Sequence, residues 1–212
     1  MNGDRIMLEE DCVMVKLNYD ILFHCQKFEC GNPDLDEFFN KDAILYDADL
    51  MGKTYFWILK DRPDTILAAF TLANDSIKTY GMPNKVKNRI QRSVANPKRG
   101  RTYPAVLIGR LGVNIHYQGG GSHIGTQVMD FIKKWFRSED NKTGCRFIVV
   151  DAVNSPSTIN FKFSQVRRGF FGRDGWSSRD MFTRRCRGRG GLFKLKHIKK
   201  HKSSMIVENL FR

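Results

Sequence analysis

The residues best placed to do chemistry are a run of glycines that precedes an amphipathic segment. Gly119–Gly121 and Gly125 lie between an apolar strand expected over 103–114 and a helix expected from about 123 to 137. Glycines let the backbone approach a ligand closely, and the free amides and dipole of a helix N-terminus favour an anion. The sequence therefore predicts a cradle for a phosphate group. The alternative is a glycine-rich turn that only joins a strand to a helix.

Two familiar phosphate-binding motifs do not fit this turn. A P-loop needs a lysine and a hydroxyl residue after its last glycine, whereas His123–Thr126 follow the glycine run here. A dinucleotide-binding fold places its glycines after an early strand, with an acidic ribose ligand on the next strand. This turn lies late in the chain and the second half of that fold is missing. The predicted phosphate-binding turn is therefore neither a P-loop nor a dinucleotide-binding motif.

The elements that must position the turn follow from hydrophobic periodicity. Asn32 and Pro33 suit the start of a helix, and 62–64 suits the turn of a hairpin. The two apolar strands on either side of the 123–137 helix should be parallel neighbours, because a helical crossover joins them. Strands are predicted at 12–17, 54–60, 66–74, 103–114 and 145–153, and helices at 20–28, 33–48 and 123–137. The expected class is α/β.

Composition limits the kind of protein this can be. The chain has 212 residues, which suits one domain with at most an appendage. No apolar run approaches the ~20 residues that span a bilayer, and the polar start is unlike a secretory signal, so a soluble, cytoplasmic protein is expected. The five cysteines are scattered without a C-x-x-C pair, which indicates reduced thiols and no metal site.

The net charge of +14 is concentrated at one end of the chain. Residues 1–155 hold 21 Lys and Arg against 19 Asp and Glu, whereas residues 156–212 hold 15 against 3. A second basic stretch, 83–101, has seven Lys and Arg and no acid. Such an excess favours polyanionic partners such as RNA, although a solvated helix face has the same composition.

The residues around the turn resemble the GNAT superfamily of N-acetyltransferases. Gly109–Asn114, then Tyr117–Gly119 with Gly121, Ile124 and Gly125, are similar to the motif with which that family cradles the pyrophosphate of acetyl-CoA. The resemblance covers about 12–160. It implies a mixed, mostly antiparallel sheet with flanking helices, whose two central parallel strands are splayed so that the pantetheine arm lies between them.

The N-terminal half narrows this resemblance. Phe28–Phe39, followed by the two strands at 54–60 and 66–74, looks like the GNAT toxins of bacterial toxin–antitoxin pairs. Those toxins acetylate the α-amine of aminoacyl-tRNA. Close relatives without toxic activity share the same pattern, so an amine of a small molecule or protein is the alternative acceptor.

Two departures from the family pattern concern the site. The loop holds two residues more than the usual spacing, so the cradle begins either at Gln118 or, as we favour, at Gly120 on the helix side. The family's general acid is a tyrosine after the fifth strand, but Lys162 stands in that slot and no tyrosine follows Tyr117. The sequence therefore assigns no catalytic residue and predicts impaired turnover.

The domain division follows from the charge and the resemblance. Residues 1–161 are expected to form the acetyltransferase domain, and residues 162–212 a basic, divergent tail. Three origins of the tail remain open: a shift of reading frame near codon 162, a natural Arg/Gly-rich nucleic-acid arm, or an ordinary divergent end. A shift of frame is suggested because purine-rich codons that spell Arg and Gly in one frame spell Glu in another.

The sequence thus predicts transfer of an acetyl group from acetyl-CoA to a primary amine. The alternative is a non-catalytic module that binds RNA or an antitoxin. Expected partners are acetyl-CoA, tRNA through Lys98, Arg99 and Arg101, an antitoxin, and a second copy of the chain in a homodimer. The residues expected to bind acetyl-CoA are Leu111, Val113, Gly120, Gly121, Ser122, His123, Ile124, Gly125, Thr126 and Asn154.

Overall fold

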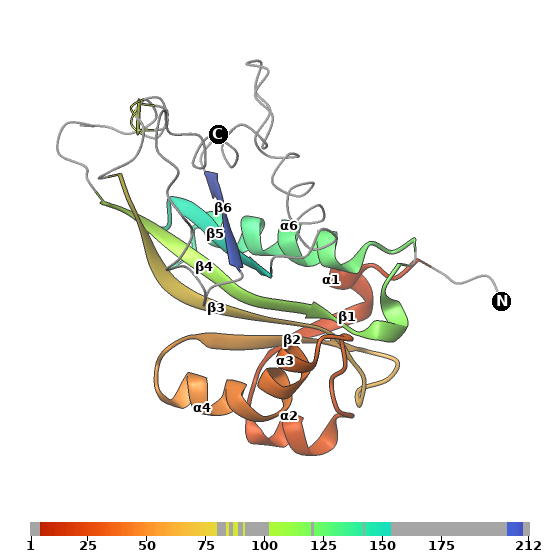
Figure 1. Cartoon of the computed structure of the whole chain (residues 1–212). Coiled ribbons are helices and arrows are strands. Elements are labelled where there is room, and N and C mark those ends of the chain that lie inside the picture. The colour runs from red at the N-terminus through yellow and green to blue at the C-terminus, as the bar shows by residue number, and fades with distance from the viewer. Residues whose placement is uncertain are drawn as a thin grey trace, which may run out of the picture.

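The computed structural model describes residues 5–79, 84, 87–88, 91, 102–119, 121–141, 143–153 and 203–209. Within these residues the chain forms one six-stranded sheet with helices on both faces (Figure 1).

The strands lie in the sheet in the order in which they occur in the chain. They are β1 (Cys12–Lys16), β2 (Lys53–Leu59), β3 (Ile66–Lys78), β4 (Thr102–Val113), β5 (Phe147–Val153) and β6 (Ser203–Asn209). All neighbours pair antiparallel except β4 and β5, which are parallel. A mixed, mostly antiparallel sheet with a central parallel pair is the class that the sequence predicts.

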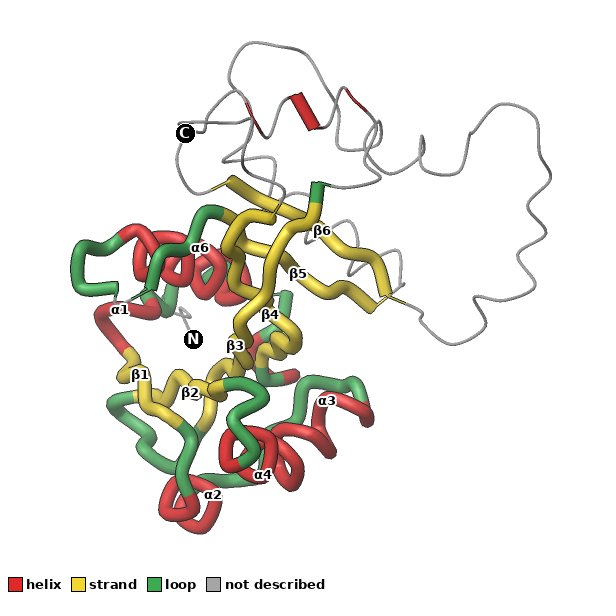
Figure 2. Tube along the Cα trace, turned by 90° about the vertical axis from the view of Figure 1, so that its left-hand side faces the viewer, coloured by secondary structure: helices red, strands yellow, loops and turns green. Residues whose placement is uncertain are grey.

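The helices divide between the two faces of the sheet. The short α1 (Leu8–Asp11) and the long α6 (Ile124–Arg137) lie on one face, and the N-terminal helices lie on the other (Figures 1 and 2). The latter are α2 (Tyr19–His24), α3 (Pro33–Glu37), the π-helical segment η1 (Phe38–Asp42) and α4 (Ala43–Ala48). A single 3-10 turn, η2 (Ile115–Tyr117), follows β4.

The continuous run from α3 through η1 to α4 corresponds to the helix predicted over 33–48. The side chain of Asn32 accepts hydrogen bonds from the amides of Asp34 and Leu35, and Pro33 occupies the first turn, as the sequence signals require. The run is helical throughout, but its middle widens from α to π geometry at Phe38–Asp42.

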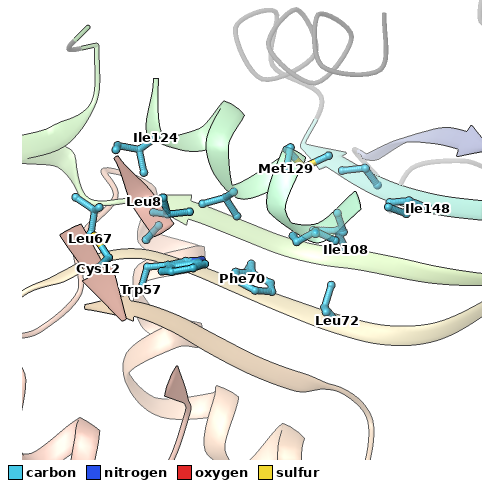
Figure 3. Packing of buried hydrophobic residues seen from close by; sticks show 14 of the residues in the cluster. Leu8, Cys12, Trp57, Leu67, Phe70, Leu72, Ile108, Ile124, Met129 and Ile148 are labelled. Atoms are coloured by element: carbon cyan, nitrogen blue, oxygen red, sulfur yellow. The ribbon is translucent and has the colours of Figure 1, made fainter. Parts of the chain in front are cut away.

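Two hydrophobic cores form because each face of the sheet is covered separately. The apolar stripe of α6 packs on β2, β3 and β4 with Leu8 of α1, so that Leu8, Phe70 and Ile108 are fully buried (Figure 3). The other face is rich in aromatic rings, and Phe28 contacts Phe39 edge to face with ring centroids 5.4 Å apart. The sheet is therefore covered by a separate core on each of its faces.

The predicted elements are confirmed with small differences at their ends. The strand expected over 66–74 continues to Lys78. Asp75, Ser76 and Lys78 are polar, so the apolar pattern ends before them, but their backbones still pair with β4. Residues 203–209 of the predicted tail form β6 beside β5, and residues 154–202 lie outside the described part of the chain. The domain boundary at 161 stays a prediction. None of the described helices has the length and apolarity needed to cross a bilayer.

Candidate functional site

The two parallel strands separate near the middle of β4. Ala105–Ile108 pair with Phe147–Val150 of β5, and the pairing ends there, while β4 continues to pair with β3 as far as Val113. The register shift between β3 and β4 places Thr71 opposite Arg110 and Leu72 opposite Ile108, which makes Gly109 the extra residue of a β-bulge. A bulge bends the strand at this point, so the splayed geometry expected from the sequence has a local cause.

The amides of Leu111 and Val113 are directed toward the side of β5. The amide of Asn114 donates to the carbonyl of Leu67 on the β3 side, at 2.9 Å. Because backbone groups of an antiparallel strand alternate in direction, the amide of Gly112 also faces β3, whereas those of Leu111 and Val113 face the other way. The pairing of β4 with β5 has already ended there. Both predicted residues therefore offer a donor to the gap between the strands.

The start of α6 supplies further donors to the same end of the sheet. The amides of Thr126 and Gln127 donate to the carbonyl of His123, at 2.9 and 3.2 Å, so they are used within the first turn. The amides of Ile124 and Gly125 belong to the end of the helix, where no preceding carbonyl of the helix can accept them. The positive end of the helix dipole lies at the same place. Ile124 and Gly125 are thus the residues of the predicted cradle with amides suited to a phosphate.

The other predicted cradle residues differ in what they can offer. Gly121 is exposed, and the hydroxyl of Ser122 accepts a hydrogen bond from the amide of Ile6 at 2.9 Å. His123 is exposed, and its side chain does not cap α6. The predicted contacts Gly120, Asn154, Lys98, Arg99 and Arg101 lie outside the described residues.

His123 adopts a left-handed backbone conformation, with φ 48° and ψ 45°. Glycine adopts this conformation without the steric cost that a Cβ brings. Leu50 has a similar φ of 57° far from this turn.

Replacing His123 with glycine should stabilise the fold by about 0.5–1 kcal/mol. Relief of the left-handed strain, roughly 1–2 kcal/mol, outweighs the entropy that a new glycine adds to the unfolded chain, about 0.4–1 kcal/mol. Urea unfolding measures the change. The matched control is Leu50→Gly, which should give a similar gain; a loss of stability in His123→Gly alone would show that the imidazole makes a contact that stabilises the loop.

Gln118, where one of the two alignments begins the cradle, is bound to the end of β4. Its amide nitrogen donates to the carbonyls of Cys30, at 2.8 Å, and Val113, at 2.7 Å, so its donors face the end of β4 and not the start of α6. The amide of Ile115 also donates to the carbonyl of Glu29, at 2.9 Å. Gln118 thus acts as a brace between β4 and the Phe28–Gly31 loop, and the helix-side alignment stays a prediction.

The Phe28–Gly31 loop packs directly on β4. A Cβ at Gly112 would lie 3.0 Å from the ring of Phe28 and 3.2 Å from Cβ and Sγ of Cys30. The loop is held in turn by the helical run, since Asn40 exchanges hydrogen bonds with the backbone of Phe28 and Asp36 accepts from the amide of Cys30 at 2.6 Å. The motif that resembles the toxins thus positions the splayed end of β4.

Gly112→Ala should lower the free energy of unfolding by about 1–3 kcal/mol. The added methyl group overpacks a buried contact in which both neighbours are fixed. Chemical denaturation with urea measures the loss, and Gly144→Ala is the control, because a Cβ there meets nothing within 4 Å. Equal stability of the two variants would show that the loop can move away from β4.

Arg110 is a further candidate residue, which reasoning from the sequence did not single out. Its guanidinium lies 3.6 Å from the ring centroid of Phe38 and 5.2 Å from that of Tyr46, on the face of β4 opposite α6. Lys16 and Lys53 nearby both pair with Asp47, at 3.0 and 2.5 Å. Arg110, by contrast, has no carboxylate partner within the described part of the chain. Its stacking on aromatic faces leaves the N–H donors available.

The cysteines of the described region are not activated as nucleophiles. Burial, reinforced by Asp36, raises the pKa of the Cys30 thiol to about 12, and burial with nearby Asp11 raises that of Cys12 to about 11. A thiolate is the reactive form, so both thiols are inert near neutral pH. No group of three or more potential metal ligands occurs among the residues that the structure describes.

Comparison with known proteins gives a result at the level of the fold. No family model matches the sequence. No curated protein matches it either. A tyrosine-to-phenylalanine mutant of KacT superposes with a TM-score of 0.55 at 18% identity, covering 79% of this chain and 92% of that one. AtaTR bound with AcCoA gives a TM-score of 0.54 at 20% identity, with 78% and 89% covered.

A third solved structure, AtaT complexed with acetyl-methionyl-tRNAfMet, gives a TM-score of 0.53 at 18% identity, covering 82% of this chain and 98% of that one. These neighbours are GNAT-fold toxins of toxin–antitoxin systems. The resemblance drawn from the sequence is therefore confirmed as a likeness of fold, and identities this low carry it no further.

Proposed function

Because the chain has the fold of the GNAT toxins, we propose that it is an acetyl-CoA-dependent N-acetyltransferase that acts on a primary amine. The observation that carries the proposal is the separation of β4 from β5 after Ile108, with the amides of Leu111 and Val113 directed into the gap. The amides of Ile124 and Gly125, which no preceding carbonyl of the helix can accept, belong to the start of α6. A long ligand with phosphate at one end and carbonyl groups along an extended arm suits this row of donors.

The order of the donors assigns a role to each. The pyrophosphate belongs at the start of α6, where the amides of Ile124 and Gly125 and the helix dipole favour negative charge. The arm then runs along β4 toward the point at which β4 and β5 meet. Val113 lies nearer the phosphate end and suits an amide carbonyl of the arm, whereas Leu111 lies deeper and suits the thioester oxygen.

The chain's contribution to chemistry would be positioning and stabilisation of charge. When bound, acetyl-CoA supplies an activated acetyl group that a neutral amine can attack. The amide of Leu111 would stabilise the negative charge that develops on the thioester oxygen. The raised pKa values of Cys12 and Cys30 support direct transfer without a protein nucleophile.

We propose the α-amine of aminoacyl-tRNA as the acceptor. The neighbour AtaT was solved with acetyl-methionyl-tRNAfMet, which supports this choice by likeness of fold. Arg110, with free donors on the other face of β4, and the basic residues Lys98, Arg99 and Arg101 would contribute positive charge toward the RNA. We also propose an antitoxin as a binding partner. The alternative acceptor is an amine of a small molecule or a protein.

A non-catalytic binding module is the second candidate, because Lys162 stands where the family has its acid. Loss of a general acid typically lowers the rate about 10²–10⁴-fold. The protein would then bind acetyl-CoA with weak turnover, or bind only RNA or an antitoxin. Position 162 lies outside the described residues.

Acetyl transfer to charged tRNA tests the proposal. The protein is incubated with radiolabelled acetyl-CoA and methionyl-tRNA, and labelled N-acetyl-methionine and free CoA are followed together. Equal, slow formation of both products supports the enzyme. Binding of acetyl-CoA in calorimetry without either product supports the binding module. The absence of both acetyl-CoA binding and turnover would reject the enzyme and leave only a module that binds RNA or an antitoxin.

A further inference from the structure

The N-terminal segment Ile6–Leu8 lies across the start of α6, more than a hundred residues away in the chain. The amide of Ile6 donates to the hydroxyl of Ser122 at 2.9 Å, and the amide of Leu8 donates to Oε1 of Gln127 at 2.7 Å. Figures 2 and 3 show α1 beside α6, with Leu8 in the same core as Ile124. This segment is therefore part of the wall of the predicted cradle.

Gln127 joins the segment to the loop before α6 through a single carboxamide. While its oxygen accepts from Leu8, its nitrogen donates to the carbonyl of Ile6 at 2.8 Å and to the carbonyl of Ser122 at 2.6 Å. A carboxamide supplies two donors and an acceptor on one planar group, and no other side chain of this size does so without a charge. The residue is half-buried, so water does not fully replace these bonds.

These contacts fix the residue that precedes the strained one. Both the carbonyl and the hydroxyl of Ser122 are bound, one by Gln127 and the other by Ile6. His123 follows directly in its left-handed conformation. Such a conformation persists only where the surroundings over-determine it. The amides of Ile124 and Gly125 take their direction from this corner.

We infer that Gln127 is a positioning residue, which uses the N-terminal segment Ile6–Leu8 to hold the loop before α6 in the shape that receives the phosphates of acetyl-CoA. This inference rests on the proposed function for its ligand, but the hold on the loop is a property of the chain alone. The affinity for acetyl-CoA then depends on the N-terminal segment, although this segment lies far from α6 in the sequence.

The variant Gln127→Met tests it in the full-length chain. Methionine keeps the length of the side chain, removes all three hydrogen bonds and adds no charge that could repel a phosphate. Without ligand, amide hydrogen exchange should rise about tenfold over 119–127 and stay unchanged in β2 and β3. Affinity for acetyl-CoA, measured by calorimetry, should fall about tenfold, which corresponds to about 1.4 kcal/mol.

Glu9→Gln is the matched control, because it breaks the exposed ion pair between Glu9, the residue after this segment, and Lys134, at 3.2 Å, and leaves the bonds to Gln127 and Ser122 intact. It should change neither readout by more than about twofold. Unchanged exchange in Gln127→Met would overturn the inference, and so would raised exchange with unchanged affinity. A third outcome is that exchange rises in Gln127→Met but the wild-type protein does not bind acetyl-CoA. This outcome would support the hold of Gln127 on the loop and reject the proposed function.

Discussion

Glutamate in place of Gly125 should reduce acetyl-CoA binding at least a hundredfold while the chain remains folded. Gly125 is buried in the first turn of α6, and its amide is among those that no helical carbonyl can accept. A side chain there places bulk and a negative charge where the proposal puts the pyrophosphate. Within a helix, glutamate is itself a better residue than glycine by roughly 0.5–1 kcal/mol, which helps to keep the helix formed.

Calorimetry with acetyl-CoA measures the loss, and circular dichroism checks the fold. Gly144→Glu is the matched control, since the same change in the loop between α6 and β5 meets open space and should leave affinity unaltered. Gly125→Ala adds bulk without charge and should give an intermediate loss. If Gly125→Glu folds and binds acetyl-CoA as tightly as the wild type, the cradle is not at the start of α6.

Proline in place of Leu111 should lower acetyl transfer about 10²–10³-fold, the cost of removing one donor to a developing oxyanion. The amide of Leu111 faces the gap between β4 and β5 and takes no part in the pairing with β3, so its loss spares the ladder. Affinity for acetyl-CoA should change much less, because the phosphate end is held elsewhere.

Single-turnover transfer to methionyl-tRNA measures this effect. Leu111→Ala is the control: it keeps the amide, removes most of the side chain, and should lose less than about tenfold. Equal losses in the two variants would place the effect in the packing of the side chain. Transfer by Leu111→Pro at the wild-type rate would exclude the amide of Leu111 as the donor.

The architecture could be predicted because each element carries its own local signal. The strands alternate or run apolar, Asn32 and Pro33 mark the start of their helix, and the stripe of α6 has helical spacing. The parallel pairing of β4 and β5 followed from the helical crossover between them. The end of β3 was missed because Asp75 and Ser76 look like a turn, although β4 pairs with them.

The contacts that define the candidate site could not be predicted in the same way. Gln118 binds a residue 88 positions away in the chain, and Gln127 binds one 121 positions away. Arg110 meets Phe38 only because the helical run and β4 are brought together by the sheet. No local pattern marks such residues, because a glutamine on a helix or an arginine on a strand has the same sequence signal whether it faces solvent or makes a long-range contact.

The π-helical segment Phe38–Asp42 sets the direction in which the side chains of the following helix, α4, point. Residues eight apart in a regular α-helix are out of line by roughly 80°, so Phe38 and Tyr46 would point in different directions. The wider turn takes up about one extra residue and brings their rings 5.7 Å apart, where both flank Arg110. Removing one residue from 39–42 would leave a regular α-helix in which these two positions are seven apart and only about 20° out of line, so Tyr46 would stay beside the arginine. Forcing the segment into α geometry without a deletion would instead swing Tyr46 away from the arginine and Asp47 away from its two lysines.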